Sequence, residues 1–299
     1  MEVLTALMRN SIRLSIFSRY LLLWLILAVI LGFYGSSYLS GFILLAPFTL
    51  SVMMFSVGLT IPLKEFRPIR GKIIPATLTQ WIMPLIGFSA GKVMGAPSEV
   101  ILGLVILGAV SNDITASVFV KLTGRSPSLS ALVTITSTFG SLIILPIFTL
   151  LLLGQLFQIS PAPVILGMIN FVIVPLLVGL FLRTRGLKVD EDKALGLASL
   201  ALVVLIGISA SQLSISILII PAILASLLMN FAGYGIGYAS AKHFDYDRSS
   251  GIYLVGLREF GVAISIVILA GLPSEVLTVL IIYGIVQTLT ASLMTRYLH

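Results

Sequence analysis

The feature that most constrains the fold is a series of about ten apolar runs, each long enough to cross a bilayer. A membrane-spanning helix needs about 20 predominantly apolar residues. The runs cover residues 18–36, 41–60, 73–94, 99–121, 129–153, 162–182, 194–210, 215–241, 249–271 and 275–295. The sequence therefore predicts an all-α integral membrane protein of about ten transmembrane helices whose main surroundings are the lipid bilayer.

Composition excludes several other classes of protein. Charged residues make up 10% of the chain and hydrophobic residues 58%, whereas soluble domains carry about 25% charged residues. The chain has no cysteine, and its two histidines, His243 and His299, lie outside the expected spans. We therefore expect no disulfide, no cysteine or histidine metal site and no cofactor.

The basic residues indicate how the chain is oriented in the membrane. All of the Lys and Arg residues except Lys92 and Arg258 fall in segments that the alternation of spans places on one side. Lys and Arg accumulate in cytoplasmic loops, so this surplus indicates topology and not nucleic-acid binding. We expect a multi-pass protein of the cell membrane, with an uncleaved first span and both termini in the cytoplasm.

The two halves of the chain repeat each other weakly. An offset of 146 residues places Gly87 on Gly233, Gly91 on Gly237, and the acid of the fourth span on the acid of the ninth. Each half, residues 1–153 and 154–299, holds five spans, so the halves must have opposite topology. Inverted repeats of this kind are typical of secondary transporters.

Three ionisable residues lie inside the expected spans and away from the span ends: Asp113, Arg258 and Glu259. A charge at the centre of a membrane helix costs about 2.5–3.5 kcal/mol on insertion scales, so such residues are functional candidates. Asp113 belongs to a polar cluster that also contains Asn112 and Thr115 and that interrupts the fourth span. Polar residues of these types compete with helical backbone bonds, which predicts a broken helix facing a cavity.

The ninth span has a similar interruption, because Arg258 and Glu259 lie between Gly256 and Gly261. Two broken helices at matching positions can cross near the membrane midplane and present their half-helix N-termini to an anion. We therefore expect a substrate site at this crossover, formed by Asn112, Asp113, Thr115, Arg258 and Glu259. The alternative is a structural role, for example an ion pair between Arg258 and Asp113.

Several motifs resemble the bile acid:sodium symporter family. They are Met53–Thr60, Gln80–Pro84, Thr115–Ser117, the segment from Leu129 to Thr134, Val255–Leu257 and Gly261–Ala263. The resemblance implies a panel domain of spans 1, 2, 6 and 7 and a core domain of spans 3–5 and 8–10. It also implies that broken spans 4 and 9 cross in the core, that the substrate is an organic anion, and that sodium ions bind behind the crossing.

The resemblance also suggests residues for an ion site. The matching positions are Gln80, Ser117, Ser130 and Thr134, to which Glu259 is added as a further candidate. Other positions depart from the family pattern, because Leu254 and Arg258 stand where sodium-binding glutamate and glutamine are expected, and Val118 replaces an asparagine. Sodium is therefore one possible coupling ion, and a proton on Glu259 or Asp113 is the other.

These observations favour a secondary active transporter of a small organic anion that works by alternating access between core and panel. A passive channel, a membrane sensor and an auxin-efflux-type carrier are the alternatives. An intramembrane enzyme would have to rely on Asp113 and Glu259 alone, since the chain offers neither cysteine nor intramembrane histidine, and we expect none. The sequence does not determine the substrate, the direction of transport or the oligomeric state.

Overall fold

The computed structural model describes residues 20–60, 66–154, 161–185, 187, 189–213 and 218–298. These residues are helical throughout, apart from turns and short connections, and they contain no β-strand beyond one isolated bridge. Five of the cations used to orient the chain lie outside the described residues: Arg9, Arg13, Arg19, Lys64 and Lys188. The all-helical class predicted from the apolar runs is confirmed.

The chain divides into two compact units. Unit 1 consists of residues Met1–Ile61 and Leu166–Gln212, and unit 2 of Pro62–Ile165 and Leu213–His299. Each unit is therefore assembled from segments that are far apart in the sequence.

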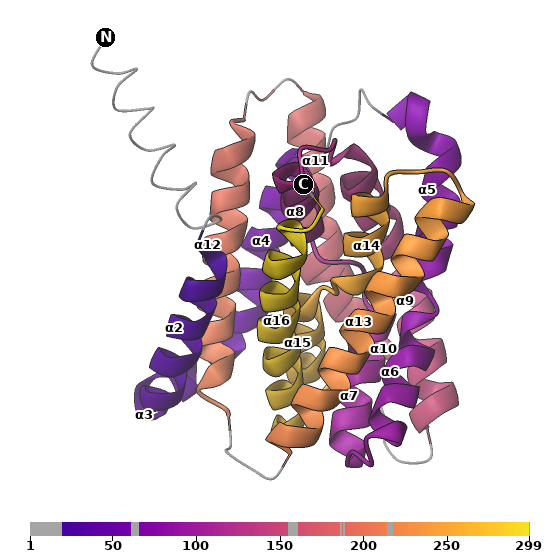
Figure 1. The fold of residues 1–299 in the computed structure, drawn as a ribbon. Coiled ribbons are helices and arrows are strands. Elements are labelled where there is room, and N and C mark those ends of the chain that lie inside the picture. The colour runs from indigo at the N-terminus through magenta and orange to yellow at the C-terminus, as the bar shows by residue number, and fades with distance from the viewer. Residues whose placement is uncertain are drawn as a thin grey trace. The chain divides into compact units, whose positions relative to one another are not determined.

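Unit 1 is built around helix α4. Its helices are α2 (Leu21–Tyr34), α3 (Ser36–Leu39), the 3-10 helix η1 (Ser40–Leu45), α4 (Ala46–Thr60), the π-helical segment η3 (Ile169–Ile173), α11 (Val174–Thr184) and α12 (Glu191–Ala210). Helix α4 packs against α11 and α12, and α12 packs against α2 (Figure 1). At the contact between α4 and α11, a Cβ atom on Gly58 would lie 2.2 Å from the Leu176 carbonyl oxygen, so the two backbones meet directly there.

The π-helical segment in unit 1 has an identifiable cause. Pro175, at the start of α11, has no N–H to donate to the carbonyl of Phe171, four residues earlier. The Ser51 hydroxyl of α4 lies 3.3 Å from that carbonyl oxygen and 3.1 Å from the Pro47 carbonyl oxygen of its own helix. A serine on a neighbouring helix is thus shared between its own helix and the carbonyl that the proline cannot bond.

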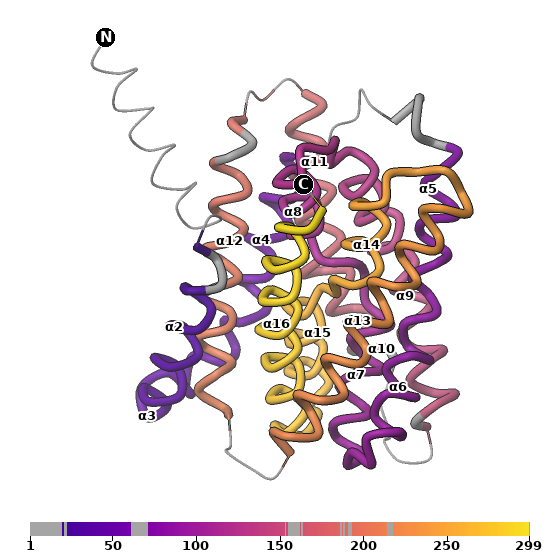
Figure 2. Tube along the Cα trace, viewed as in Figure 1, coloured from indigo at the N-terminus to yellow at the C-terminus, as the bar shows by residue number. Residues whose placement is uncertain are grey.

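Unit 2 holds the interrupted helices. Its helices are α5 (Phe66–Gln80), α6 (Met83–Val93), α7 (Ser98–Ala109), α8 (Thr115–Leu122), α9 (Ser128–Leu153), α13 (Ile219–His243), α14 (Arg248–Gly256), α15 (Phe260–Leu269) and α16 (Ser274–Thr295). Helix α10 (Pro161–Met168) includes residues of both units. Figure 2 follows the chain from α14 into α15 through a short non-helical stretch.

Small residues bring the helices of unit 2 close together in pairs. A Cβ atom on Gly87 of α6 would lie 2.5 Å from the Leu104 carbonyl oxygen of α7. A Cβ atom on Gly237 of α13 would lie 2.1 Å from the Gly251 carbonyl oxygen of α14. These glycines therefore allow α6 and α13 to pack directly on the first halves of the interrupted helices, as small residues do at membrane helix contacts.

Seven helices of the described residues are long and apolar enough to cross a membrane. Three shorter apolar helices, Leu23–Tyr34, Ser98–Ala109 and Phe260–Leu269, lie within the expected spans 18–36, 99–121 and 249–271. Ser98–Ala109 and Phe260–Leu269 are short because their spans are interrupted. Most helical extents agree with the predicted ones to within a few residues, as for α9 (Ser128–Leu153 against 129–153). The expected span 73–94 is an exception, because it is divided between α5 and α6 and α5 begins at Phe66.

Candidate functional site

The two interruptions in unit 2 meet each other. Asn112 and Arg258 form an antiparallel β-bridge. The Asp113 N–H donates to the Leu257 carbonyl at 3.1 Å, and the Glu259 N–H donates to the Ser111 carbonyl at 3.0 Å. The bridged residues are 146 positions apart, which is the offset at which the two halves of the sequence align. Backbone groups that the interruptions remove from helical bonding thus satisfy each other.

The guanidinium group of Arg258 lies at the end of helix α7. It is fully buried. Its Nε donates to the Leu107 carbonyl at 3.1 Å, and its Nη2 donates to the Gly108 carbonyl at 2.7 Å and to the Val110 carbonyl. Its Nη1 donates to Oε1 of Gln80 at 3.1 Å. The last carbonyls of a helix have no hydrogen-bond partner within the helix, and they carry the negative end of its dipole. The side chain of Arg258 supplies donors to these carbonyls, and its positive charge offsets the negative end of the dipole.

The structure does not form the ion pair between Arg258 and Asp113 that the sequence allowed as a structural alternative. Of the described residues, no acid lies within 4.0 Å of the guanidinium nitrogens. Gln287 of α16 connects the two residues instead. Its Nε2 donates to Asp113 Oδ2 at 2.8 Å and to the Arg258 carbonyl at 3.0 Å, and its Oε1 accepts from the Arg258 N–H at 2.8 Å.

Sequence reasoning did not include Gln287 among the site residues. A large amide in the middle of an apolar span was the available signal, because such a group is costly in lipid unless it is hydrogen-bonded. The Gln287 side chain is buried and makes all three of the bonds just described.

The two buried carboxyl groups lie at the start of helix α8. Asp113 Oδ1 accepts from the Thr115 N–H at 2.7 Å, and Glu259 Oε2 accepts from the Ile114 N–H at 3.3 Å. This is one of the half-helix N-termini that the sequence assigned to a substrate anion. In the structure, carboxyl groups of the protein itself occupy it. Both oxygens of Asp113 are hydrogen-bonded, whereas Oε1 of Glu259 has no partner in the described part of the chain.

Asn112 points to helix α9. Its Nδ2 donates to Thr134 Oγ1 at 2.7 Å, and its Oδ1 accepts from Ser137 Oγ at 3.0 Å. All three side chains are buried. The bridge residue of the first interruption is therefore fixed to a continuous helix through its side-chain amide.

The five ion-site candidates have different surroundings. Gln80 Oε1 accepts from Arg258, and Thr134 Oγ1 accepts from Asn112. The hydroxyl groups of Ser117 and Ser130 are buried and have no hydrogen-bond partner in the described residues, which is also true of Glu259 Oε1. Three candidates thus keep a free oxygen ligand, and Gln80 uses its oxygen for the guanidinium.

The end of helix α14 is satisfied differently from the end of α7. Asn230 Nδ2 donates to the Gly256 carbonyl at 2.7 Å, and the Tyr283 hydroxyl donates to the same carbonyl at 3.1 Å. Thr290 in turn donates to Asn230 Oδ1 at 2.6 Å. Neutral side chains therefore hydrogen-bond to the end of the second interrupted helix, while a charged side chain hydrogen-bonds to the end of the first.

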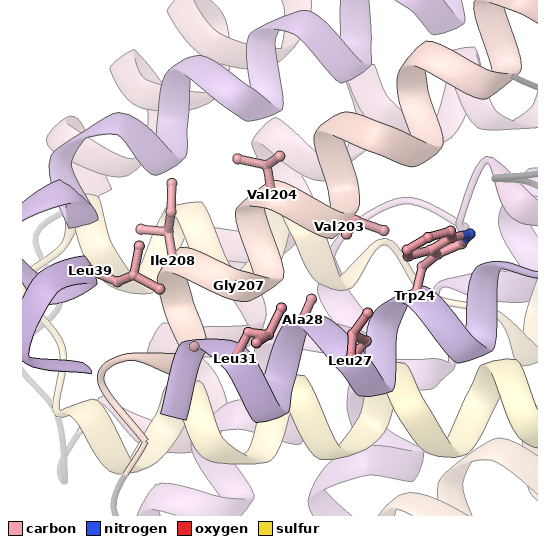
Figure 3. Close-up of a pocket in the computed structure, with 10 residues that line it drawn as sticks. Trp24, Leu27, Ala28, Leu31, Leu39, Val203, Val204, Gly207 and Ile208 are labelled. Atoms are coloured by element: carbon pink, nitrogen blue, oxygen red, sulfur yellow. The ribbon is translucent and has the colours of Figure 1, made fainter. Parts of the chain in front are cut away.

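Unit 1 contains a cavity of about 340 Å³ between helices α2 and α12. Figure 3 shows Trp24 at one end and aliphatic side chains such as Leu31, Val204 and Ile208 along its length. No acidic or basic side chain lines it. Apart from the indole N–H of Trp24, its lining side chains offer an anion neither a donor nor a positive charge, so the crossover of unit 2 remains the candidate site.

Comparison with known proteins supplies the family context. The sequence model described as "Sodium Bile acid symporter family" matches residues 47–231. The "Uncharacterized sodium-dependent transporter YocS" of Bacillus subtilis is 24% identical over 295 residues, which are 92% of this chain and 89% of that protein. The chain is also similar to two chloroplast proteins of plants.

"Probable sodium/metabolite cotransporter BASS1, chloroplastic" of Arabidopsis thaliana is 24% identical over 210 residues, which are 67% of this chain and 52% of that protein. "Probable sodium/metabolite cotransporter BASS2, chloroplastic" of Oryza sativa subsp. japonica is 28% identical over 163 residues, which are 52% of this chain and 38% of that protein. The aligned part therefore spans about half or less of these two relatives.

Proposed function

Because the chain belongs to the Sodium Bile acid symporter family, we propose that it is a secondary active transporter of a small organic anion. The observation that carries this proposal is the buried crossover, where two interrupted helices bring Asp113, Arg258 and Glu259 together inside a multi-pass membrane protein. Ionisable residues inside membrane helices and interrupted helices at matching positions of two repeats are features of transporter sites.

We further propose that unit 1 is the panel and unit 2 the core of such a transporter. The division of the chain supports this, since unit 1 contains the first, second and seventh expected spans and most of the sixth. The bridge between residues 146 positions apart supports an inverted repeat of two five-helix halves. For the topology we propose ten crossings and cytoplasmic termini. For the mechanism we propose alternating access by movement of one unit.

The placement of the carboxyl groups suggests why transport of an anion would be coupled to the binding of a proton or a sodium ion. Asp113 and Glu259 occupy the start of helix α8, so a substrate anion approaching that N-terminus would meet negative charge. When both carboxyl groups are ionised, they and the guanidinium together carry a net charge of one negative unit. A proton or a sodium ion bound at the carboxyl groups would neutralise this charge and admit the anion.

Glu259 is the stronger candidate for this role. Its Oε1 has no hydrogen-bond partner in the described residues, whereas both oxygens of Asp113 have one. An unpaired buried oxygen is costly unless it gains a partner. We propose that Glu259 takes up the coupling ion and that Asp113 mainly holds the crossover together.

Uptake into liposomes tests the proposal. Purified protein is reconstituted and offered a panel of radiolabelled small organic acids, under an imposed sodium gradient, an imposed proton gradient or neither. We expect saturable uptake of at least one acid, acceleration by one of the gradients, and loss of that acceleration in Glu259→Gln. Glu275→Gln, at the start of α16, is the matched control and should keep the acceleration.

Two results would contradict parts of the proposal. Uptake that neither gradient nor Glu259→Gln affects would exclude coupling through this residue. Flux that increases linearly with substrate concentration would favour a passive channel over a carrier.

A further inference from the structure

We propose that the guanidinium group of Arg258 occupies a cation-binding site and permanently takes the place of a sodium ion there. The site consists of the carbonyl oxygens of Leu107, Gly108 and Val110 and the side-chain oxygen of Gln80. Sodium therefore does not bind at these oxygens in this chain. The inference concerns binding, and it rests on the proposed function only for its consequence in transport.

The ligand atoms are those that a small hard cation prefers. All four are uncharged oxygens, and hard cations such as calcium are bound by carbonyl, amide and carboxylate oxygens. Three of them belong to the last turn of α7 or to the residue that follows it, where the negative end of the helix dipole adds to their attraction for positive charge. The arrangement would bind a cation whether or not that cation were attached to the protein.

The guanidinium is a buried charge without a partner of opposite charge. It is 0% exposed, and no carboxyl group of the described residues lies within salt-bridge distance. Buried charges are normally paired, because removing them from water is costly. Here three backbone carbonyl oxygens and one side-chain amide oxygen receive the guanidinium, as they would receive a dehydrated metal ion.

The second interrupted helix shows that capping a helix end does not require a charge. The Gly256 carbonyl, at the end of α14, is satisfied by the neutral side chains of Asn230 and Tyr283. A neutral amide could equally have served α7. The presence of an arginine at the first site, and not at the second, therefore points to a site that needs positive charge.

Arg258 also joins the parts of the crossover that a shared ion would join. Its backbone forms the bridge with Asn112 and is held by Gln287, while its side chain reaches α7 and, through Gln80, the end of α5. One residue thus connects the second interrupted helix to the first. A dissociable cation would make the same connection only while it was bound.

Sodium binding to the purified protein tests the inference without any transport measurement. In Arg258→Gln the charge is removed and the four oxygens are released, while an amide remains to hydrogen-bond. Equilibrium binding of ²²Na⁺ in detergent, with choline replacing sodium in the reference buffer, should show about one more bound ion per chain than the wild type. Arg258→Lys keeps the positive charge and should show no additional ion.

A second measurement keeps the test decisive if Arg258→Gln does not fold. Gln80→Met removes the Gln80 ligand oxygen in a chain that retains Arg258. Any sodium binding of the wild-type chain should be unchanged in this variant, because the wild type does not use that oxygen for sodium. Where Arg258→Gln does fold, the double variant with Gln80→Met should lose about tenfold or more of the additional sodium affinity.

Each outcome decides one point. A monodisperse Arg258→Gln protein without additional sodium binding would overturn the inference, as would reduced sodium binding in Gln80→Met alone. Failure to find any transported acid would count against the proposed function and would leave the sodium-binding contrast intact. The two proposals can therefore fail separately.

Discussion

Asn112 and Arg258 lie opposite each other in the backbone bridge of the crossover, and Gln287 holds Arg258 in place through both its N–H and its carbonyl. Replacing Gln287 by leucine would leave the Arg258 N–H and Asp113 Oδ2 without their partner, while the Arg258 carbonyl would keep the N–H of Phe260. Each buried polar group that loses its partner costs about 1–3 kcal/mol. We expect Gln287→Leu to lower the melting temperature in detergent clearly and to abolish substrate uptake.

Thr288→Val is the matched control for this prediction. Thr288 is also buried in α16, but its hydroxyl donates only to the Gly284 carbonyl of its own helix. This variant should stay close to the wild type in both measurements. Equal losses of melting temperature and of uptake in the two variants would show that α16 is sensitive to any substitution.

Gly237 and Gly235 provide a test of the close contact between α13 and α14. A Cβ atom on Gly237 would lie 2.1 Å from a backbone oxygen of Gly251, so Gly237→Ala must push the two helices apart. No atom lies within 4 Å of a Cβ atom on Gly235 in the same helix. We expect a lower melting temperature for Gly237→Ala, and an unchanged or slightly higher one for Gly235→Ala because alanine favours helix.

The start of helix α14 depends on Asp247. Its Oδ2 accepts from the Ser250 N–H at 2.7 Å, which is the bond of a helix N-cap, and its Oδ1 lies 3.6 Å from Arg125 Nε. Loss of an N-cap costs about 0.5–2 kcal/mol, whereas an exposed ion pair contributes about 0–1 kcal/mol. Equilibrium unfolding should therefore show a larger loss of stability for Asp247→Ala than for Arg125→Ala.

Asp247→Asn separates the two contributions further. Asparagine caps a helix about as well as aspartate does, but it cannot form the ion pair. Its free energy of unfolding should therefore match that of Arg125→Ala. A loss as large as that of Asp247→Ala would mean that the negative charge, and not the cap, stabilises this end of α14.

Thr134 anchors the first interruption to α9. In Thr134→Val, Asn112 Nδ2 loses its 2.7 Å bond, while the shape of the side chain is kept. In Thr138→Val only a bond to the Thr134 carbonyl of the same helix is lost. We expect Thr134→Val to unfold at a lower temperature than Thr138→Val and to show faster amide hydrogen exchange at residues 110–114.

Much of the helical architecture could be predicted from the sequence, because apolar runs and their interruptions are local signals. The polar cluster around Asn112 and the charged pair at Arg258 and Glu259 marked the places where α7 and α14 end. Those interruptions account for the short length of four helices: α7, α8, α14 and α15. The family resemblance carried by the motifs is confirmed by the family match.

The partners of the buried charges could not be predicted in the same way. The acceptors of Arg258 are mostly backbone carbonyls, which every residue possesses, so no side chain in the sequence marks Leu107 or Gly108 as a ligand. The occupation of the α8 N-terminus by Asp113 and Glu259 likewise depends on how the two interruptions meet. The ion pair between Arg258 and Asp113, which the sequence allowed as an alternative, is therefore not formed in the structure.

The covalent attachment of the Arg258 guanidinium has an energetic consequence for any transport cycle. A sodium ion that is released on the far side carries charge across the membrane and gives up the free energy of its electrochemical gradient, whose electrical part is about 2.3 kcal/mol per elementary charge for each 100 mV of membrane voltage. An attached cation returns with the protein, so its electrical work over a closed cycle is zero. The oxygens around Arg258 therefore stabilise the crossover but contribute nothing to the driving force for accumulation.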